Sequence, residues 1–179
     1  MQKNKIIIAI YVDNQYGVLS RVTAMFTRRG YNIDSLTVGE TESPEYSRIT
    51  ITLSAEKNEK DQVVSQLRKL YNVKKVIVLS AEECIKRELL LIKVRNTEQQ
   101  HADIVEATNI FRTKIIDFTD EAISIEATGD SQKIDAFIEY MKKFDIIEMC
   151  RTGLVALDRG GVNWWSCWNA ATYWMAPST

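Results

Sequence analysis

Hydrophobic and polar positions along this chain follow two different periods, which together predict an ordered series of strands and helices. Residues 6–12 form a nearly continuous apolar run, typical of a central strand with both faces at least partly covered. Residues 47–53 alternate between apolar and polar, which predicts a strand with one buried face. Between these segments, apolar residues recur at the spacing of one helix face: Val18, Leu19, Val22, Met25 and Phe26.

The first half of the chain reads as strand, helix, strand, strand, helix, strand. Gly30 follows two arginines and supplies a left-handed stop for the first helix. A charged stretch at 56–61 opens the second helix after a turn at 41–45. We expect the four strands at 6–12, 33–40, 47–53 and 73–79. This order is the ferredoxin-like arrangement.

The second half repeats this order. We expect strands at 88–94, 114–118, 122–128 and within 146–156, and helices at 102–112 and after a cap at 129–131. The fold class predicted is therefore α+β, with two tandem ferredoxin-like (βαββαβ) units of about 75 residues each. The two domains are placed at residues 4–80 and 84–157, with a short, ordered connection at 81–84.

The last segment, residues 161–179, departs from this pattern because it holds all four tryptophans of the chain. One interpretation is an aromatic segment that docks onto a partner, since tryptophan is enriched at interface hot spots. The other is an atypical C-terminal tail that packs loosely or not at all. We favour the second interpretation.

Composition excludes several classes of protein. The net charge is −1, from 23 basic and 24 acidic residues, so nothing steers the chain toward nucleic acid or an anionic membrane. No run approaches the roughly 20 apolar residues that span a bilayer, and the run at 6–12 is too short for a signal peptide. Three distant cysteines are expected to be reduced thiols in a cytoplasmic protein, mostly as packing residues. His101, the only histidine, is expected on the solvent side of a helix, and no metal site is predicted.

The most informative stretch is the glycine turn at 14–17 and the helix that follows it. The backbone amides that open a helix have no intrahelical acceptor and can hold a carboxylate. No catalytic residues are predicted, because no side chain nearby has a matched partner for acid, base or nucleophile chemistry. The pattern favours a site that binds a small anion and does not transform it.

The residues of this stretch and of several later motifs resemble one family, the small regulatory subunits of acetohydroxyacid synthase (acetolactate synthase). The general part of the resemblance is the ACT domain, a ferredoxin-like module that binds amino acids, assigned to residues 4–80. The specific part consists of the segments 20–22, 29–38, 47–51, 87–89 and 151–153. The resemblance covers about residues 4–160.

The family implies a non-catalytic protein that associates with a large catalytic subunit and raises its activity. That subunit carries thiamine diphosphate, magnesium and FAD, whereas this chain is expected to bind no cofactor. The family also implies a homodimer formed through ACT domains and feedback inhibition by valine, with leucine or isoleucine as alternatives. Residues 84–157 would form a second regulatory domain.

The resemblance places the effector at the interface between two protomers. One protomer supplies the turn and the first helical residues, and its neighbour completes the pocket. In this picture Asn32 satisfies a remaining polar group of the ligand and Ile33 lines its apolar part. The effector-binding residues predicted are Asn14, Gln15, Tyr16, Gly17, Val18, Leu19, Asn32 and Ile33.

Each of these residues also has a purely structural interpretation. Asn14 and Gly17 suit a tight turn, Asn32 tolerates a left-handed backbone after a glycine, and Ile33 is a core residue in most settings. Many ACT domains have proline before the glycine, where this chain has Tyr16, so turn rigidity is in doubt. The tryptophan-rich segment has no counterpart in the family.

Three alternative functions remain open at this point. The chain could be an enzyme, because ferredoxin-like folds host catalysis and Asp13 and Asp34 lie near the motif. It could be an RNA-binding module, since those domains share the strand order, although Ile49, Ile51 and Leu53 stand where stacking aromatics would be needed. It could also be an ACT-domain amino-acid sensor that regulates a different enzyme.

Overall fold

The computed structural model describes residues 4–80 and 82–159. The tryptophan-rich segment predicted at 161–179, residue 81 of the predicted connection, and Cys167 lie outside the described residues.

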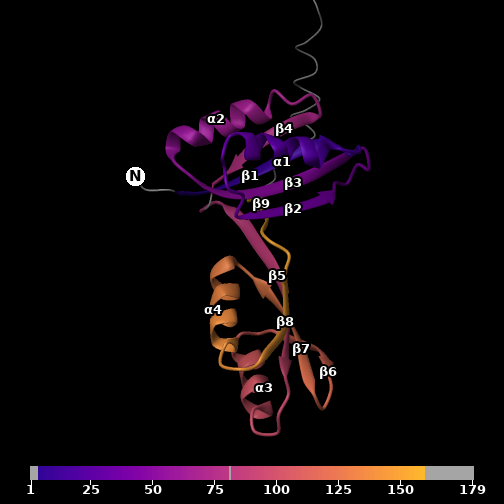
Figure 1. Cartoon of the computed structure of the whole chain (residues 1–179), viewed down its shortest axis with the longest axis vertical. Coiled ribbons are helices and arrows are strands. Elements are labelled where there is room, and N and C mark those ends of the chain that lie inside the picture. Colours follow the sequence, from indigo (N-terminus) through magenta and orange to yellow (C-terminus); the bar gives the residue numbers. More distant parts are fainter. Residues whose placement is uncertain (1–3, 81, 160–179) are drawn as a thin grey trace, which may run out of the picture.

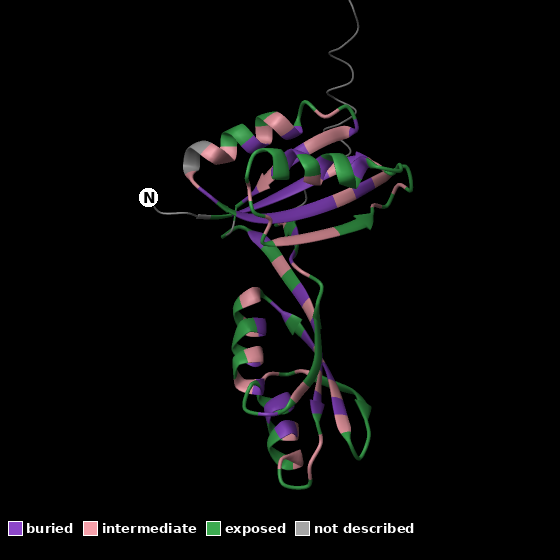
Figure 2. Cartoon of the chain, viewed as in Figure 1, coloured by how far each residue is buried: buried purple, intermediate pink, exposed green. Residues whose placement is uncertain are grey.

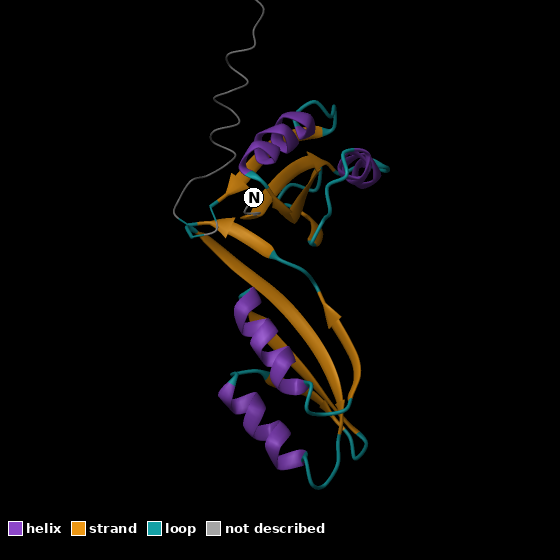
Figure 3. Ribbon diagram, turned by 60° about the vertical axis from the view of Figure 1, so that its left-hand side comes forward, coloured by secondary structure: helices purple, strands orange, loops and turns teal. Residues whose placement is uncertain are grey.

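The first unit is a four-stranded antiparallel sheet with two helices on one face (Figure 1, Figure 3). Its spatial strand order is β2-β3-β1-β4, so β1 lies in the interior of the sheet, as the apolar run predicted. The elements are β1 (Asn4–Asp13), α1 (Val18–Arg28), β2 (Ser35–Glu40), β3 (Tyr46–Ala55), α2 (Lys57–Leu67) and β4 (Val73–Leu79). The predicted βαββαβ order of this unit is confirmed.

Both faces of β1 are buried, because alternate side chains enter two different cores. Ile8 and Ile10 pack with Val22 and Phe26 of α1 in the core beneath the helices. Ile7, with Ala9, faces the opposite side and belongs to a second, smaller cluster. Figure 2 shows the resulting band of buried residues along the central strands.

The second unit repeats the arrangement, with spatial strand order β6-β7-β5-β8. Phe137 is fully buried between its helices and its sheet. The N-cap residue Asp130 accepts a 2.8 Å hydrogen bond from the Lys133 amide, which explains the helix start predicted there. The elements are β5 (Cys84–Arg95), α3 (His101–Ile110), β6 (Lys114–Phe118), β7 (Ala122–Gly129), α4 (Ser131–Met141) and β8 (Ile146–Arg151).

The last strand differs from the sequence prediction, because the segment 146–156 is divided in two. β8 ends at Arg151, and Gly153, with φ of 85°, turns the chain into a separate strand, β9 (Val155–Asp158). β9 leaves the second unit and pairs antiparallel with the first residues of β5, Cys84 to Arg87. β5 is accordingly longer than predicted and runs from one unit into the other (Figure 1).

The strand β9 and the residues before it seal the helix-free face of the first sheet. Leu154 and Ala156 are buried there with Ile7, Ala9, Leu79 and Cys84. Polar contacts fix the same junction: the Leu154 amide donates to Ser35 Oγ at 3.0 Å, and Thr37 Oγ1 donates to the Leu154 carbonyl at 3.2 Å. Arg48 donates to the Ala156 carbonyl. The two units therefore share a core and are not joined by a loop alone.

Replacing Gly153 by alanine is expected to weaken this junction. An L-residue at φ of 85° is strained, and the added Cβ would lie 3.0 Å from Ser35 Oγ. We expect the free energy of unfolding to fall by about 1–2 kcal/mol, measured by urea denaturation. Gly39→Ala is the control, because its Cβ meets nothing within 4 Å and its φ is not positive. Equal stability of the two variants would contradict this account.

Two predictions about single residues were only partly correct. Cys84 is buried as expected, but Cys150 is exposed, so the prediction of a packing cysteine is wrong there. His101 begins α3 and is half-buried: its Nδ1 lies 3.3 Å from Asn96 Oδ1, and its ring meets Phe118 edge-on. The polar residues around His101 gave no sign of this contact, because Phe118 lies on a strand distant in sequence.

Candidate functional site

The turn between β1 and α1 requires glycine for its backbone conformation. Gly17 is the N-cap of α1 and has φ of 78° and ψ of −2°. This is a left-handed backbone conformation, which residues other than glycine adopt at a cost in free energy. A Cβ built on Gly17 would meet nothing within 4 Å in a single protomer. Within one chain, therefore, the turn explains the glycine, and the space above it is open to a ligand.

The first turn of α1 leaves two amides without an acceptor. The Val18 amide donates weakly to the Gln15 carbonyl at 3.4 Å, and the Arg21 amide donates to the Gly17 carbonyl at 3.1 Å. Among the hydrogen bonds of the described residues, none has the amide of Leu19 or Ser20 as donor. No acidic residue lies in this turn to offset the positive end of the helix dipole. The site can therefore hold a carboxylate.

Ser20 was missing from the sequence prediction, although its position supplies the signal. It is the third residue of α1, and the first helical amides always lack an intrahelical partner. The glycine motif itself extends only to Leu19, so Ser20 falls outside the predicted set. The side chain of Leu19 is partly exposed and Tyr16 is fully exposed, so both can contact a second molecule.

Asn14 anchors the turn to the neighbouring hairpin. Its Nδ2 donates to Glu40 Oε1 at 3.1 Å and to the Pro44 carbonyl at 3.0 Å, and its backbone amide donates to the Glu45 carbonyl. These bonds are those of a turn residue. They leave Asn14 Oδ1 as the atom available to accept a hydrogen bond from an ammonium group.

A polar network behind the turn fixes its position. Lys74 Nζ lies 2.9 Å from Asp13 Oδ2, Arg21 Nη1 donates to Asn72 Oδ1 at 2.7 Å, and the Asp13 amide donates to the Asn72 carbonyl at 3.0 Å. The hydrogen bond to Asp13 raises the pKa of Lys74 above its ordinary value. The network joins the end of β1, the first turn of α1 and the start of β4, so it holds the open amides in place.

Alkaline pH is expected to destabilise the first unit. Burial raises the pKa of Tyr11 above its ordinary value of 10.0, so the folded chain retains a proton that the unfolded chain releases. Lys74 acts with the same sign: its stabilising contribution is present below its ordinary pKa of 10.5 and is lost as pH rises through its folded pKa. Urea midpoints measured from pH 8 to 11 should fall above about pH 10. Tyr11→Phe should flatten this fall, and an unchanged profile would contradict it.

Asn32 and Ile33 lie at the opposite end of α1 from the turn. The helix has 11 residues and so separates the two groups by roughly 16 Å at 1.5 Å per residue. Asn32 is exposed, with Nδ2 3.4 Å from Asp34 Oδ1, and Ile33 is half-buried against the first core. One protomer does not bring together the two halves of the predicted site. They could meet only across two protomers.

Comparisons with known proteins decide the family. Residues 8–75 match the model described as the AHAS small subunit-like ACT domain, and residues 87–160 match the small subunit of acetolactate synthase. The acetolactate synthase small subunit of Mycobacterium leprae is 44% identical over 153 residues, covering 86% of this chain and 90% of that protein. The chain belongs to the acetolactate synthase small subunit family.

Two further proteins of the acetolactate synthase small subunit family are similar to this chain over most of their length. The "Probable acetolactate synthase small subunit" of Methanothermobacter thermautotrophicus is 44% identical over 161 residues, covering 89% of this chain and 96% of that protein. The crystal structure of the acetolactate synthase small subunit from Thermotoga maritima has a TM-score of 0.83 at 38% identity, covering 89% of this chain and 99% of that one. The predicted family and the predicted fold class are thereby confirmed.

The described part of the chain carries neither a metal-binding cluster nor a helix suited to a membrane. In residues 4–80 and 82–159, no group of three or more His, Cys, Asp or Glu side chains is arranged to hold a metal ion. In the same residues, no helix has the length and apolar character needed to cross a bilayer.

Proposed function

We propose that this chain is a non-catalytic regulatory subunit that binds the catalytic subunit of acetolactate synthase in the cytoplasm, activates it, and makes it sensitive to valine. The observation that carries the proposal is the first turn of α1, where open amides and a bare glycine are held by a fixed network in a member of the small subunit family. Thiamine diphosphate, magnesium and FAD would reside on the catalytic partner.

The proposed effector site is formed by two protomers of a homodimer. The amides of Leu19 and Ser20 would hold the effector's carboxylate, and Asn14 Oδ1 would accept from its ammonium group. Asn32 and Ile33 of the other protomer would close the pocket, and burial of the isopropyl group would contribute roughly 1.5–3 kcal/mol. Leucine and isoleucine differ from valine by one methylene, worth about 1–3 kcal/mol, so they are the competing effectors.

Regulation follows if the effector contacts two protomers. Its binding then favours the arrangement of protomers in which both halves of the site meet. A coupling free energy of about 1–3 kcal/mol would change the activity of the catalytic partner severalfold. The fold supports this view, because residues of both units pack in one shared core at their junction.

Reconstitution tests the proposal. The catalytic subunit from the same organism is assayed for acetolactate formation from pyruvate, alone and with the full chain, in the presence and absence of valine. We expect higher activity with the chain and valine inhibition only in its presence. Turnover by the chain alone would refute the regulatory role. Activation without a response to valine, leucine or isoleucine would refute the effector assignment and favour a sensor of a different amino acid.

A further inference from the structure

A second polar cleft lies where the two units meet, away from the glycine turn. It has a volume of about 410 Å³, within the range of roughly 300–1,000 Å³ that is typical of small-molecule sites. Its walls come from β1, β2 and β3 of the first unit, and from β5, α4, the end of β8 and the β8–β9 connection of the second. A ligand in this cleft would therefore contact both units.

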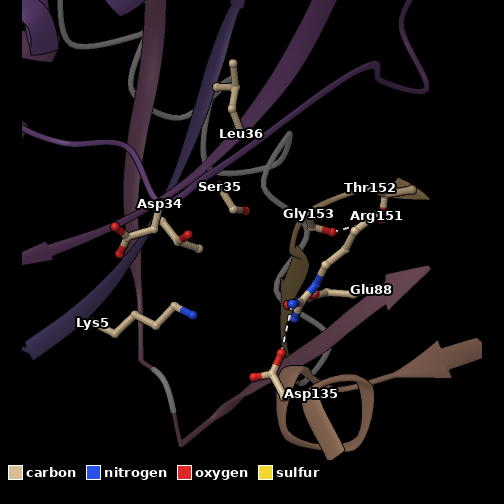
Figure 4. A pocket seen from close by; sticks show the side chains of 10 residues that line it. Lys5, Asp34, Ser35, Leu36, Glu88, Asp135, Arg151, Thr152 and Gly153 are labelled. Atoms are coloured by element: carbon tan, nitrogen blue, oxygen red, sulfur yellow. Dashed lines mark hydrogen bonds and ion pairs between the residues drawn. The ribbon is translucent and has the colours of Figure 1, made fainter. Parts of the chain in front are cut away.

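One wall of the cleft carries hydrogen-bonding groups that the protein leaves unused. In the described part of the chain, no ion pair or hydrogen bond involves the ammonium of Lys5, and Figure 4 shows that it points into the space between the walls. Thr52 is fully buried, yet its Oγ1 has no hydrogen-bond partner among the described residues. Buried polar atoms are nearly always paired in folded proteins, so this unpaired hydroxyl is an exception in the wall of the cleft.

The opposite wall is a paired charge cluster. Arg151 Nε donates to the buried carboxylate of Glu88, which also accepts from Ser131 Oγ. Arg151 Nη1 donates to Asp135 Oδ1 at 2.8 Å (Figure 4). The second oxygen of Asp135 has no bond among those of the described residues, and this side chain is 63% exposed. This wall therefore offers one negative acceptor opposite the positive donor of Lys5.

From this arrangement we infer that the cleft binds a free α-amino acid. Its carboxylate is held by the Lys5 ammonium, and its ammonium is held by the open oxygen of Asp135. A dianion such as phosphate fits less well, because the carboxylates of Glu88, Asp135 and Asp34 also line the cleft. The ligand bridges the two units and so stabilises their present orientation. This site is separate from the one at the start of α1.

Thermal unfolding of the full chain with each standard amino acid tests the inference, first in the Gly17→Asp background, which removes the proposed carboxylate position at α1. We expect at least one amino acid to raise the melting temperature of this variant. Calorimetric titration of the same amino acid should show an affinity at least about tenfold lower after Lys5→Gln. Lys5→Arg should restore much of this affinity, and Lys60→Gln on α2 is the matched control.

Each other outcome overturns the inference. If no amino acid raises the melting temperature of the Gly17→Asp variant, the cleft does not bind one. Any stabilisation of the parent chain by an amino acid then comes from the site at α1 alone. An affinity equal in Lys5→Gln and Lys60→Gln places binding elsewhere. Acetate and inorganic phosphate serve as further probes. If either binds as tightly as the amino acid, or if Asp135→Asn leaves the amino acid's affinity unchanged, the cleft is an anion site with no role for the ammonium group.

Discussion

Gly17→Asp is expected to abolish valine binding to the intact chain while leaving it folded. The aspartate carboxylate would stand where the ligand's carboxylate should lie, and two unit charges about 4 Å apart repel by about 4 kcal/mol at an effective dielectric constant near 20. That energy corresponds to a loss of affinity of roughly a thousandfold. The fold should survive, because the Cβ at this position meets nothing within 4 Å and aspartate tolerates a left-handed backbone.

Gly17→Asn is the matched control, because it has nearly the shape of aspartate without the charge. Calorimetric titration with valine should show a far smaller loss for the asparagine variant than for the aspartate variant. Equal losses would assign the effect to the side chain's bulk or to a disturbed turn. Unchanged affinity in a folded Gly17→Asp chain would exclude the proposed position of the carboxylate.

The second large effect is expected at the junction of the two units. Leu154 is 2% exposed and packs with Ile7, Ala9 and Leu79 under the first sheet. Leu154→Ala deletes buried atoms and leaves a cavity, which should lower the free energy of unfolding by about 2–5 kcal/mol. Urea denaturation of the chain without its catalytic partner measures this loss.

Leu157→Ala removes the same atoms from a residue on the adjoining strand β9 that is 52% exposed. Its stability should stay within about 0.5 kcal/mol of the parent chain. A similar loss in both variants would mean that the junction is no better packed than the surface. A selective loss at Leu154 would establish that both units depend on the shared cluster.

Local pattern was sufficient to predict most of the fold. The limits of β4 and β6 agree with the prediction, because each lies between clear turn or helix signals. The apolar run of β1 predicted two buried faces, and Ile7 and Ile8 indeed enter different cores. The sequence pattern did not predict which segment covers the helix-free face, because β9 lies about 150 residues further along the chain.

The sequence pattern also did not predict that the last strand is divided in two, and the reason is related. Gly153 belongs to a segment that resembles the family, and its left-handed turn becomes necessary only once the chain must return to the first unit. At the candidate site, the sequence motif identified the glycine turn but not Ser20, because the open Ser20 amide follows from its position at the helix start and not from its residue type. The charged cleft was beyond prediction, because Lys5, Asp135 and Arg151 meet only through tertiary structure.

The position of β9 also has a consequence for biosynthesis. The helix-free face of the first sheet is covered by residues 154–156, so a nascent chain that has completed β4 still exposes Ile7, Ala9 and Leu79 to water. The amino-terminal half can mature only after residues 154–156 have been translated. A fragment ending at residue 80 would keep this apolar underside uncovered and would tend to self-associate.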